Sequence, residues 1–495
     1  MVPIMTRAAV YTLSLLLLLL CTLHSRDVVN AAHSSQPNII FILADDLGWS
    51  DVGWRNPFMP TPTLDKMATE GMILNQSYVQ QTCSPSRAAL MSGRYPYHIG
   101  FQHETVSANH VFHLPNDQLI MPEALKKLGY ATHMVGKWHL GFCNWRYTPT
   151  YRGFQSFYGY YNAAEDYYTH IQKHGYDFRD DDQVDKSAVG HYSTNLFTDR
   201  AIRIINDHNT SQPLFLYLAY QAVHEPLQVP QWYLDQHCSS IVDNDRKIKC
   251  GMVAALDEGV KNVTDTLKQR GLMDNTFIIF SSDNGGPVRA AASNYPLRGS
   301  KITIWEGGTR AAAFVYAPSL LQKTNSSYEE LIHITDWYPT LVEAAGGGSS
   351  VANIDGVSQW KNLLSGGSGP RHEFLYNMDE VTNSSALRQG RFKLVQGYPG
   401  NPNGWFVTPE LEKLVNATTD EIHNGRGHSP PYQLFNLNRD PEERNDILDS
   451  HQDVFQQMKA RLDSYRPSLL PSKTTDRVHA ADPSNFNGNW SPGWC

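Results

Sequence analysis

The sequence predicts an α/β protein: a large, mixed but mostly parallel sheet sandwiched by helices, then a smaller C-terminal α+β domain with an antiparallel sheet. Three observations predict this fold. Short runs that are apolar throughout alternate with helical patterns along the main part of the chain, as in strands buried on both faces. Glycine- and serine-rich stretches at 346–350 and 366–370 indicate a domain boundary. The runs beyond that boundary are typical of antiparallel strands.

The elements follow in chain order. The strands expected in the large sheet are the apolar runs 38–44, 131–135, 213–220 and 276–280. Helical patterns between them occupy 63–70, 193–206 and 252–270. In the C-terminal part we expect strands at 391–395 and 432–437 and a helix at 452–465. The glycine pairs at 285–286 and 307–308 lack nucleotide-loop spacing and are interpreted as tight turns.

The N-terminus predicts export. Arg7 precedes the apolar stretch 8–20, and small residues at 29–31 offer a cleavage site, so residues 1–31 are interpreted as a signal peptide. The apolar stretch is shorter than a bilayer span, although an uncleaved anchor is the alternative, and we expect no transmembrane segment after cleavage. Residues 36–365 would form the main domain and 370–495 the C-terminal domain. Six glycosylation sequons fit the secretory pathway, at Asn75, Asn209, Asn262, Asn325, Asn383 and Asn416.

Composition excludes some classes of function. Hydrophobic residues make up 41% and charged residues 18% of the 495 residues, which is typical of a globular enzyme. The net charge is −8, and no run of lysine and arginine indicates nucleic-acid binding. An anionic substrate would therefore need basic residues gathered locally.

Polar side chains follow each strand predicted for the large sheet. Parallel strands end at one edge of a sheet, so these side chains should meet there. The groups are Asp45 and Asp46, then Lys137 and His139, then His224, then Asp283 and Asn284. Three carboxylates and one amide supply only oxygen ligands, which calcium or magnesium prefers, and calcium tolerates several carboxylates best.

The sharpest motif is Cys83-Ser84-Pro85-Ser86-Arg87, with Gly93-Arg94 downstream. Its pattern Cys-x-Pro-x-Arg resembles the signature of the sulfatase family. The resemblance extends to Gly-Lys-Trp-His at 136–139, His-Glu-Pro at 224–226 and Asp-Asn-Gly-Gly at 283–286, in that order. It begins near residue 37, reaches the C-terminal region, and is closest to the N-acetylgalactosamine-4-sulfatases (arylsulfatase B). Pro85 and the following residues also predict a helix that begins near Cys83, and a helix N-terminus favours anions.

The resemblance implies the chemistry. The sheet would be alkaline-phosphatase-like, and a formylglycine-generating enzyme would oxidise Cys83 to formylglycine, the nucleophile. A hydrated aldehyde can attack sulfur with one hydroxyl and release sulfate with the other, which a serine cannot do. One calcium ion would lie beside residue 83 among Asp45, Asp46, Asp283 and Asn284. Arg87 would orient the nucleophile and His139 would act as base. Lys137, His224 and Lys301 would bind the sulfate, with His224 or Lys301 as the proton donor.

The cysteines give a disulfide prediction. If Cys83 is catalytic and Cys21 leaves with the signal peptide, four cysteines remain, and they allow three connectivities. Cys238 and Cys250 are near neighbours in a polar segment, which favours their pairing and leaves Cys143 with Cys495.

The substrate is less constrained. The expected substrate is a sulfated glycosaminoglycan sugar such as N-acetylgalactosamine 4-sulfate, with aryl sulfates as surrogates. Residues 377–388 and 398–405 lack the cysteines common in the resembled subfamily, so a different sulfated substrate stays open. His103 is a further candidate near the cleft. The aromatic-rich stretch 154–168 is interpreted as core, with a sugar platform as the alternative.

Other functions remain. A phosphatase or phosphodiesterase of the same broad superfamily would use Ser or Thr with zinc, which Cys83 and the oxygen ligands disfavour. An inactive secreted glycoprotein that binds calcium or glycans is the third class. The sequence does not choose between the lysosome and the extracellular space.

Overall fold

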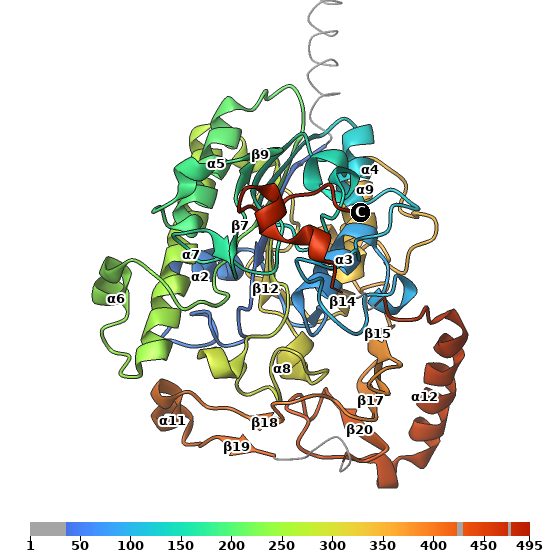
Figure 1. Cartoon of the computed structure of the whole chain (residues 1–495). Helices are drawn as coiled ribbons and strands as arrows, with labels where there is room; N and C mark the ends of the chain where they lie inside the picture. The colour runs from blue at the N-terminus through green and yellow to red at the C-terminus, as the bar shows by residue number, and fades with distance from the viewer. Residues whose placement is uncertain (1–35, 423–428, 474–476) are drawn as a thin grey trace, which may run out of the picture.

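A ten-stranded sheet forms the centre of the molecule (Figure 1). The computed structural model describes residues 36–422, 429–473 and 477–495, so the expected signal peptide lies outside the described residues. Five neighbouring strands are parallel: β11 (Thr276–Ser282), β1 (Asn38–Ala44), β10 (Leu214–Ala219), β4 (Ala131–Lys137) and β5 (Ser156–Tyr160). Antiparallel pairing joins β12 (Ala313–Tyr316) to β11 and β8 (Arg179–Asp180) to β5. The predicted mixed, mostly parallel sheet is confirmed.

The remaining strands extend this sheet at its edges. β2 (Met72–Leu74) pairs antiparallel with β12, β13 (Ser326–Tyr328) pairs parallel with β2, and β9 (Gln183–Val184) pairs antiparallel with β8. Small pairs lie outside the sheet: β3 (Ser77–Tyr78) with β14 (Ile332–His333), β6 (Ile171–Gln172) with β7 (Gly175–Tyr176), and β18 (Gly404–Trp405) with β19 (Asp420–Glu421).

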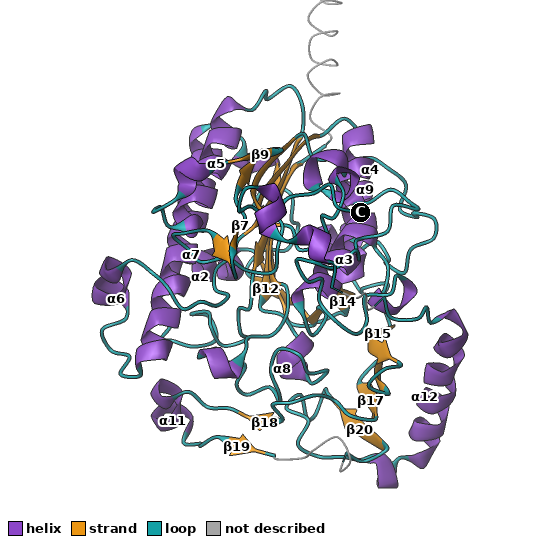
Figure 2. Ribbon diagram, viewed as in Figure 1, coloured by secondary structure: helices purple, strands orange, loops and turns teal. Residues whose placement is uncertain are grey.

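Both faces of the large sheet are buried, which explains why its strands are apolar at every position. Along β1, Ile39 and Phe41 pack into one hydrophobic cluster while Ile40 and Ile42 pack into another. Helices cover both faces (Figure 2). The first cluster includes α3 (Cys83–Ser92), α4 (Met121–Lys127) and α9 (Trp337–Ala344). The second includes α2 (Pro62–Glu70), α5 (Ser193–Asp207) and α7 (Asn244–Gln269).

Helix α7 is longer than predicted. It begins at Asn244 rather than near residue 252, because the Asp243 carboxylate caps it by accepting a hydrogen bond from Arg246 N at 2.8 Å. The first turns of α7 are polar, so a search for an apolar helical pattern did not include them. Shorter helices are α6 (Gln231–His237), α8 (Glu306–Thr309), α10 (Trp360–Ser365) and α11 (Pro409–Val415).

A second, antiparallel sheet follows in the C-terminal part. Its strand order is β15 (Glu373–Asp379), β16 (Ser384–Gln389), β17 (Phe392–Gln396) and β20 (Tyr432–Asn436). Helix α12 (Gln452–Tyr465) packs against it through Met458 and Leu462. The two strands and the helix expected here are confirmed, whereas β15 and β16 were not predicted. The domain limits at 365 and 370 stay a prediction.

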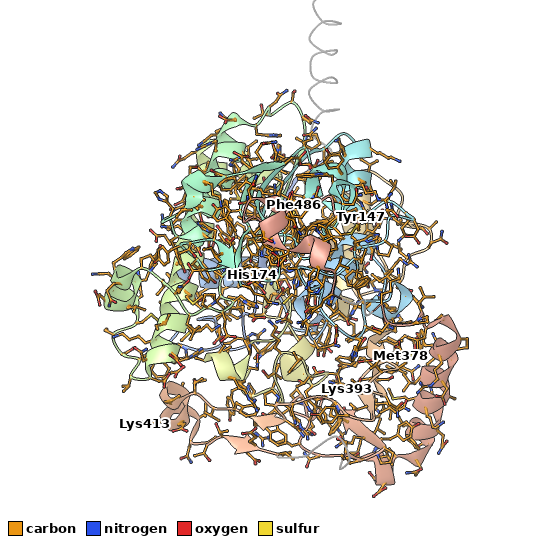
Figure 3. All side chains as sticks on the ribbon, in the orientation of Figure 1. Tyr147, His174, Met378, Lys393, Lys413 and Phe486 are labelled. Carbon is orange, nitrogen blue, oxygen red and sulfur yellow. A yellow bond between two sulfur atoms is a disulfide. The ribbon has the colours of Figure 1, made fainter. Side chains whose placement is uncertain are left out.

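A buried charged group joins the two sheets. We define the junction cluster as Glu306, Lys393, Glu443, Tyr78 and Tyr376. Lys393 Nζ lies 3.1 Å from Glu306 and 2.7 Å from Glu443, and both tyrosine hydroxyls donate to Glu306. Glu306 and Tyr78 come from the main part of the chain, and Lys393 and Tyr376 from the second sheet. Figure 3 labels Lys393 within the packed side chains of this lower region.

The end of the chain returns to the large sheet. Both predicted disulfides are confirmed, Cys143–Cys495 and Cys238–Cys250. Arg179 Nη2 donates to the Trp490 carbonyl at 2.7 Å, which adds a polar contact to this return. No helix in the described ranges is both long and apolar enough to cross a bilayer. The stretch 154–168 is mostly buried, which agrees with its interpretation as core.

The glycine pairs allow two loops to touch. Gly285 N donates to the Gly308 carbonyl at 2.9 Å. A Cβ at Gly285 would lie 1.8 Å from the Gly307 carbonyl oxygen, so only glycine permits this approach. The contact brings the loop after β11 against α8, next to the ends of the parallel strands.

Candidate active site

The polar residues that follow the parallel strands meet at one edge of the sheet. Asp45 and Asp46 come directly after β1, Lys137 ends β4, and Asp283 and Asn284 follow β11. His224 comes after β10, and Arg87 reaches the same place from α3. All of these side chains are largely buried, so their charges interact through protein rather than through water.

Asp46 is the hub of one half of the group. Its carboxylate lies 2.7 Å from Lys301 Nζ, accepts from Asn284 Nδ2 at 2.7 Å and lies 3.5 Å from His224 Nε2. Burial alone would raise the pKa of Asp46, but Lys301 together with the neighbouring His224 and Lys137 outweighs it and holds that pKa below its usual range. Burial lowers the pKa of Lys301, but Asp46 outweighs that effect and raises it above the ordinary value.

Arg87 organises the other half. Its guanidinium donates to Asp283 Oδ2 through Nε at 3.1 Å and Nη2 at 2.8 Å, and lies 3.6 Å from Asp45. Lys137 Nζ donates to Asp45 Oδ2. Burial and the repulsion of Asp45 raise the pKa of Asp283 to about 6, against the opposing effect of Arg87. The site therefore packs three carboxylates against three basic side chains.

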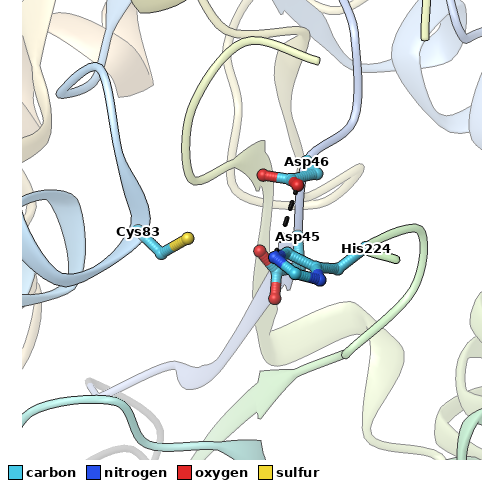
Figure 4. A group of neighbouring side chains, drawn as sticks. All are labelled: Asp45, Asp46, Cys83 and His224. Carbon is cyan, nitrogen blue, oxygen red and sulfur yellow. Dashed lines mark ion pairs between the residues drawn. The ribbon is translucent and has the colours of Figure 1, made fainter. Parts of the chain in front are cut away.

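Cys83 is the first residue of α3, as the motif predicted. Its side chain is 2% exposed and points toward the two aspartates in Figure 4. Burial raises the pKa of the Cys83 thiol to about 11, which the cations of Lys137 and Lys301 only partly oppose. At neutral pH the unmodified thiol is therefore protonated and is a weak nucleophile.

Four of these residues could hold a metal ion. One ligand atom from each of Asp45, Asp46, Cys83 and His224 lies within 4.8 Å of the others (Figure 4). Asp45 Oδ1 and Asn284 Oδ1 are buried and have no hydrogen-bond partner among the described residues. Buried oxygens without donors are unfavourable unless a cation or another donor satisfies them, so the residues fit a hard cation.

Each of the two histidines, His139 and His224, uses one ring nitrogen in a hydrogen bond to a backbone carbonyl. His139 Nε2 donates to the Val106 carbonyl at 3.0 Å, so a neutral His139 carries its lone pair at Nδ1, which has no partner among the described residues. Burial and the cations Lys137 and Arg87 lower the pKa of His139 well below its usual value. His224 Nδ1 donates to the Glu225 carbonyl at 2.7 Å, and burial helped by Lys301 lowers its pKa to about 3.

A cavity of about 650 Å³ opens over this group, and we call it the first chamber. Cys83, His139, His224 and Lys301 line it. His103, the further candidate from the sequence, stands at its side and lies 2.9 Å from Asp379 of β15. Asp379 and Asn377 were missed, because they follow the boundary stretch and carry no local motif.

The structure brings all the expected site residues together, but with two differences from the expected ligand set. His224, expected only at the sulfate, also joins the possible metal group. Asp283 and Asn284 instead contact Asp46, since Asp283 Oδ1 accepts from Asp46 N at 3.2 Å and Asn284 donates its amide to the Asp46 carboxylate.

Comparison with known proteins decides the family. A sulfatase family model matches residues 37–347, which covers the parallel sheet and every residue of the site. The chain belongs to the sulfatase family. This sulfatase is 39% identical to arylsulfatase J of Mus musculus, over 94% of its own length and 82% of that relative's. It is 28% identical to N-acetylgalactosamine-6-sulfatase of the same organism, over 96% of this chain and 94% of that one.

Solved structures share the fold of this sulfatase. Ps i-CgsB in complex with k-i-k-neocarrahexaose superposes with a TM-score of 0.77 at 26% sequence identity, covering 91% of this sulfatase and 97% of that chain. A PsFucS1 sulfatase from Pseudoalteromonas sp. superposes with a TM-score of 0.70 at 23% identity, over 91% and 94% of the two chains, and supports the fold. This sulfatase is a sulfuric ester hydrolase.

Proposed function

We propose that this sulfatase removes sulfate from a sulfated carbohydrate, with formylglycine made from Cys83 as its nucleophile and one calcium ion beside it. The observation that carries the proposal is the meeting of Cys83, three carboxylates and the basic residues Arg87, Lys137 and Lys301 at one chamber. A sulfate ester needs positive charge around its oxygens and a nucleophile opposite its leaving group, and this edge of the sheet offers both.

Calcium fits the oxygen ligands that this site offers. Asp45, Asp46, Asp283 and Asn284 would hold it beside residue 83, and the unpartnered oxygens of Asp45 and Asn284 support this assignment. When bound, calcium would offset the crowded carboxylates and attract the sulfate oxygens. His224 Nε2, 3.5 Å from Asp46, is a further donor that a soft metal would use more readily than calcium.

The protonated thiol of Cys83 is a weak nucleophile, which supports a formylglycine made from Cys83, rather than the thiol itself, as the attacking group. A hydrated formylglycine supplies two hydroxyls on one carbon, one to attack sulfur and one to release the sulfate afterwards. Arg87 would orient that side chain from the next turn of α3. His139 would take a proton at its unpartnered Nδ1. Lys137 and Lys301 would bind the sulfate oxygens, and either His224 or Lys301 would protonate the leaving oxygen.

The biosynthetic route is part of the proposal. Two disulfides support passage through an oxidising compartment. Four of the six sequon asparagines are exposed, at Asn209, Asn325, Asn383 and Asn416, and Asn75 and Asn262 are half-buried. We propose a glycosylated protein that meets a formylglycine-generating enzyme in the secretory pathway, and then resides in the lysosome or outside the cell.

For the substrate we propose a sulfated glycan sugar, with the 4-sulfate of N-acetylgalactosamine as the first candidate. Names of relatives support this class: one is an N-acetylgalactosamine-6-sulfatase, and one solved neighbour holds a neocarrahexaose. Fragments with 4-sulfate, 6-sulfate and heparan-type sulfate should be compared under identical conditions. Inert 4-sulfated fragments beside turnover of another class would overturn the candidate and leave the sulfatase chemistry intact.

The deciding experiment combines mass and metal analysis. Protein made in a eukaryotic secretory system should show formylglycine in the peptide that contains residue 83, and active enzyme should contain one calcium per chain. Asp46→Ala should lose calcium and activity together, because Asp46 anchors both Lys301 and Asn284. Full activity with an unmodified Cys83, or stoichiometric zinc without calcium, would contradict the proposal.

A further inference from the structure

A second chamber adjoins the first. It has a volume of about 320 Å³. Thr82, His103 and Ile302 line both chambers and so form the wall between them. The second sheet and the loop at 398–401 form its outer side. Ile304 N donates to the Pro399 carbonyl at 2.9 Å, which holds that loop against the residues after Lys301. Ile302 N in turn donates to the Gln81 carbonyl at 2.7 Å. A substrate whose sulfate lies at Cys83 would extend past Thr82 into this space.

The second chamber is chemically unlike the first. In the described part of the chain no lysine or arginine lines it, whereas Lys301 and Arg477 line the first. Its histidine and its carboxylate, His103 and Asp379, pair at 2.9 Å. Asp379 also accepts from Thr382 Oγ1 at 2.7 Å and from Val381 N at 2.9 Å, so its negative charge is fixed in place. Among the described residues, a second sulfate or a carboxylate would find no lysine or arginine here, and the one histidine already pairs with Asp379.

Two residues that line this chamber, Asn377 and Gln81, have side-chain amide oxygens that lack donors in the part of the chain that the structure describes. Asn377 is 3% exposed, and its Nδ2 donates to the Gln102 carbonyl at 2.8 Å, which fixes the orientation of the amide. Its Oδ1 and the Oε1 of Gln81 are buried without a hydrogen-bond partner among the described residues. Asn377 follows a β-bulge in β15, and bulges re-aim side chains beside active sites. Such acceptors require donors, and the hydroxyl groups of a sugar are donors.

An apolar surface completes the chamber. Ile302 is 57% exposed although it is a large hydrophobic residue, and it stands at the boundary of the two chambers with Ile304 and Pro399 nearby. The apolar face of a sugar ring can cover such a surface while its hydroxyls reach the amide oxygens. The lining thus offers apolar contact, unpaired acceptors and fixed negative charge, which together suit an uncharged sugar.

We propose that the second chamber is a subsite for an uncharged sugar unit linked to the sulfated one, which donates hydroxyl hydrogens to Asn377 Oδ1 and Gln81 Oε1. The subsite disfavours a uronic acid or a second sulfate at that position. The inference rests on the proposed function, since it assumes that a sulfate ester is cleaved at Cys83. It narrows the substrate to glycans in which a neutral sugar neighbours the sulfated one, and it therefore counts against chains in which N-acetylgalactosamine 4-sulfate is linked to a uronic acid.

The test compares two disaccharides that share the same sulfated N-acetylhexosamine. One carries a neutral hexose beside it, and the other carries a hexuronic acid. A small aryl sulfate, which reaches only the first chamber, reports on the chemistry and on correct folding. Wild-type enzyme should show a kcat/KM for the neutral disaccharide about 10-fold or more above that for the acidic one, the scale of an anion placed against unpaired acceptors.

Two variants and one control sharpen the test. Gln81→Met, which keeps the side-chain length, should lower kcat/KM for the neutral disaccharide by about 3- to 10-fold, the loss of one hydrogen bond, and leave aryl sulfate within about twofold. Asn401→Arg places a cation at the exposed rim and should shift the ratio toward the acidic disaccharide by about 5-fold. Gln236→Arg makes the same change of charge on the exposed side of α6 and should leave the ratio unaltered.

The outcomes separate the two proposals. A wild-type enzyme that prefers the acidic disaccharide, or that cleaves the aryl sulfate but neither disaccharide, would overturn the subsite and leave the chemistry standing. Variants at Gln81 and Asn401 whose substrate ratio equals that of wild type would also overturn it. Wild-type enzyme with formylglycine and calcium that cleaves none of the three substrates would instead overturn the proposed function.

Discussion

Two buried groups of charged side chains lie in this sulfatase, and they differ in what surrounds them. The group at the ends of the parallel strands faces the first chamber and leaves oxygens of Asp45 and Asn284 without donors. The junction cluster lines neither chamber, and each oxygen of Glu306 has a donor within hydrogen-bond distance. Its one oxygen without a hydrogen bond among the described residues, Glu443 Oε1, lies 2.7 Å from Lys393 Nζ. Burial and charge therefore do not mark an active site by themselves, whereas unsatisfied polar atoms that face a cavity do.

This comparison predicts opposite consequences of substitution. Variants of the first group should lose far more activity than any loss of stability explains, because their side chains serve a ligand even where they also form buried ion pairs. Variants of the junction cluster should lose stability and keep the activity of the molecules that remain folded.

Cys83→Ala should abolish sulfate release, with a loss of at least about 10⁴-fold, the scale of removing a nucleophile. The Cys83 side chain is small and forms no disulfide, so the melting temperature should stay near that of wild type. Sulfate release from an aryl sulfate and thermal unfolding check both parts. Retained turnover would show that residue 83 is not the nucleophile.

Lys393→Met should reduce the free energy of unfolding by about 3–5 kcal/mol, since it leaves two buried carboxylates without their shared cation. Denaturant unfolding measures the loss, and kcat per folded molecule should stay within about twofold of wild type. Lys413→Met, on exposed α11, is the matched control and should change neither quantity. A stable but inactive Lys393→Met enzyme would break the comparison.

Lys137→Ala and Lys301→Ala should each lower turnover by roughly 10²- to 10³-fold, the effect of losing one preorganised charge in a transition state. Lys261→Ala, an exposed lysine on α7, serves as control. Effects below about threefold would mean that these lysines do not face the sulfate.

Turnover of aryl sulfates also identifies the proton donor. His224→Gln and Lys301→Gln should be compared over aryl sulfates whose leaving phenols differ in pKa. The variant whose defect shrinks with the most acidic phenol has lost the proton donor, because a good leaving group needs no proton.

Glu443→Gln should remove a pH dependence of stability. Burial raises the pKa of Glu443 from 4.5 to about 7, although Lys393 opposes the rise. The folded protein therefore holds a proton that the unfolded chain releases, so this stabilisation is complete below pH 4.5 and is lost as the pH rises through 7. Wild type should lose about 1–3 kcal/mol more than the variant between pH 4.5 and 8. If denaturant titrations gave wild type and Glu443→Gln the same dependence of stability on pH, this prediction would be wrong.

The sequence predicted the first group far better than the second chamber. Asp45, Lys137 and Asp283 follow apolar strands, and the topology of a parallel sheet places strand ends together without knowledge of any other contact. Asn377 and Gln81 carry no such signal. They line one chamber only because the second sheet packs beside the first. The bulge before Asn377 depends in turn on the pairing of β15 with β16. The strands β15 and β16 escaped prediction for the related reason that they mix polar with apolar residues.

The disulfide between Cys143 and Cys495 has a consequence for the timing of folding. It closes a loop across 352 positions of sequence, so it forms only after all of residues 143–495 have been made. Strand β1 likewise waits for β10 and β11, its two neighbours, which are translated much later. Residue 83 thus emerges from the ribosome well before the walls that bury it exist. The enzyme proposed to oxidise this cysteine would have that interval in which to reach it, and any change that speeds the closure of the fold would shorten the interval.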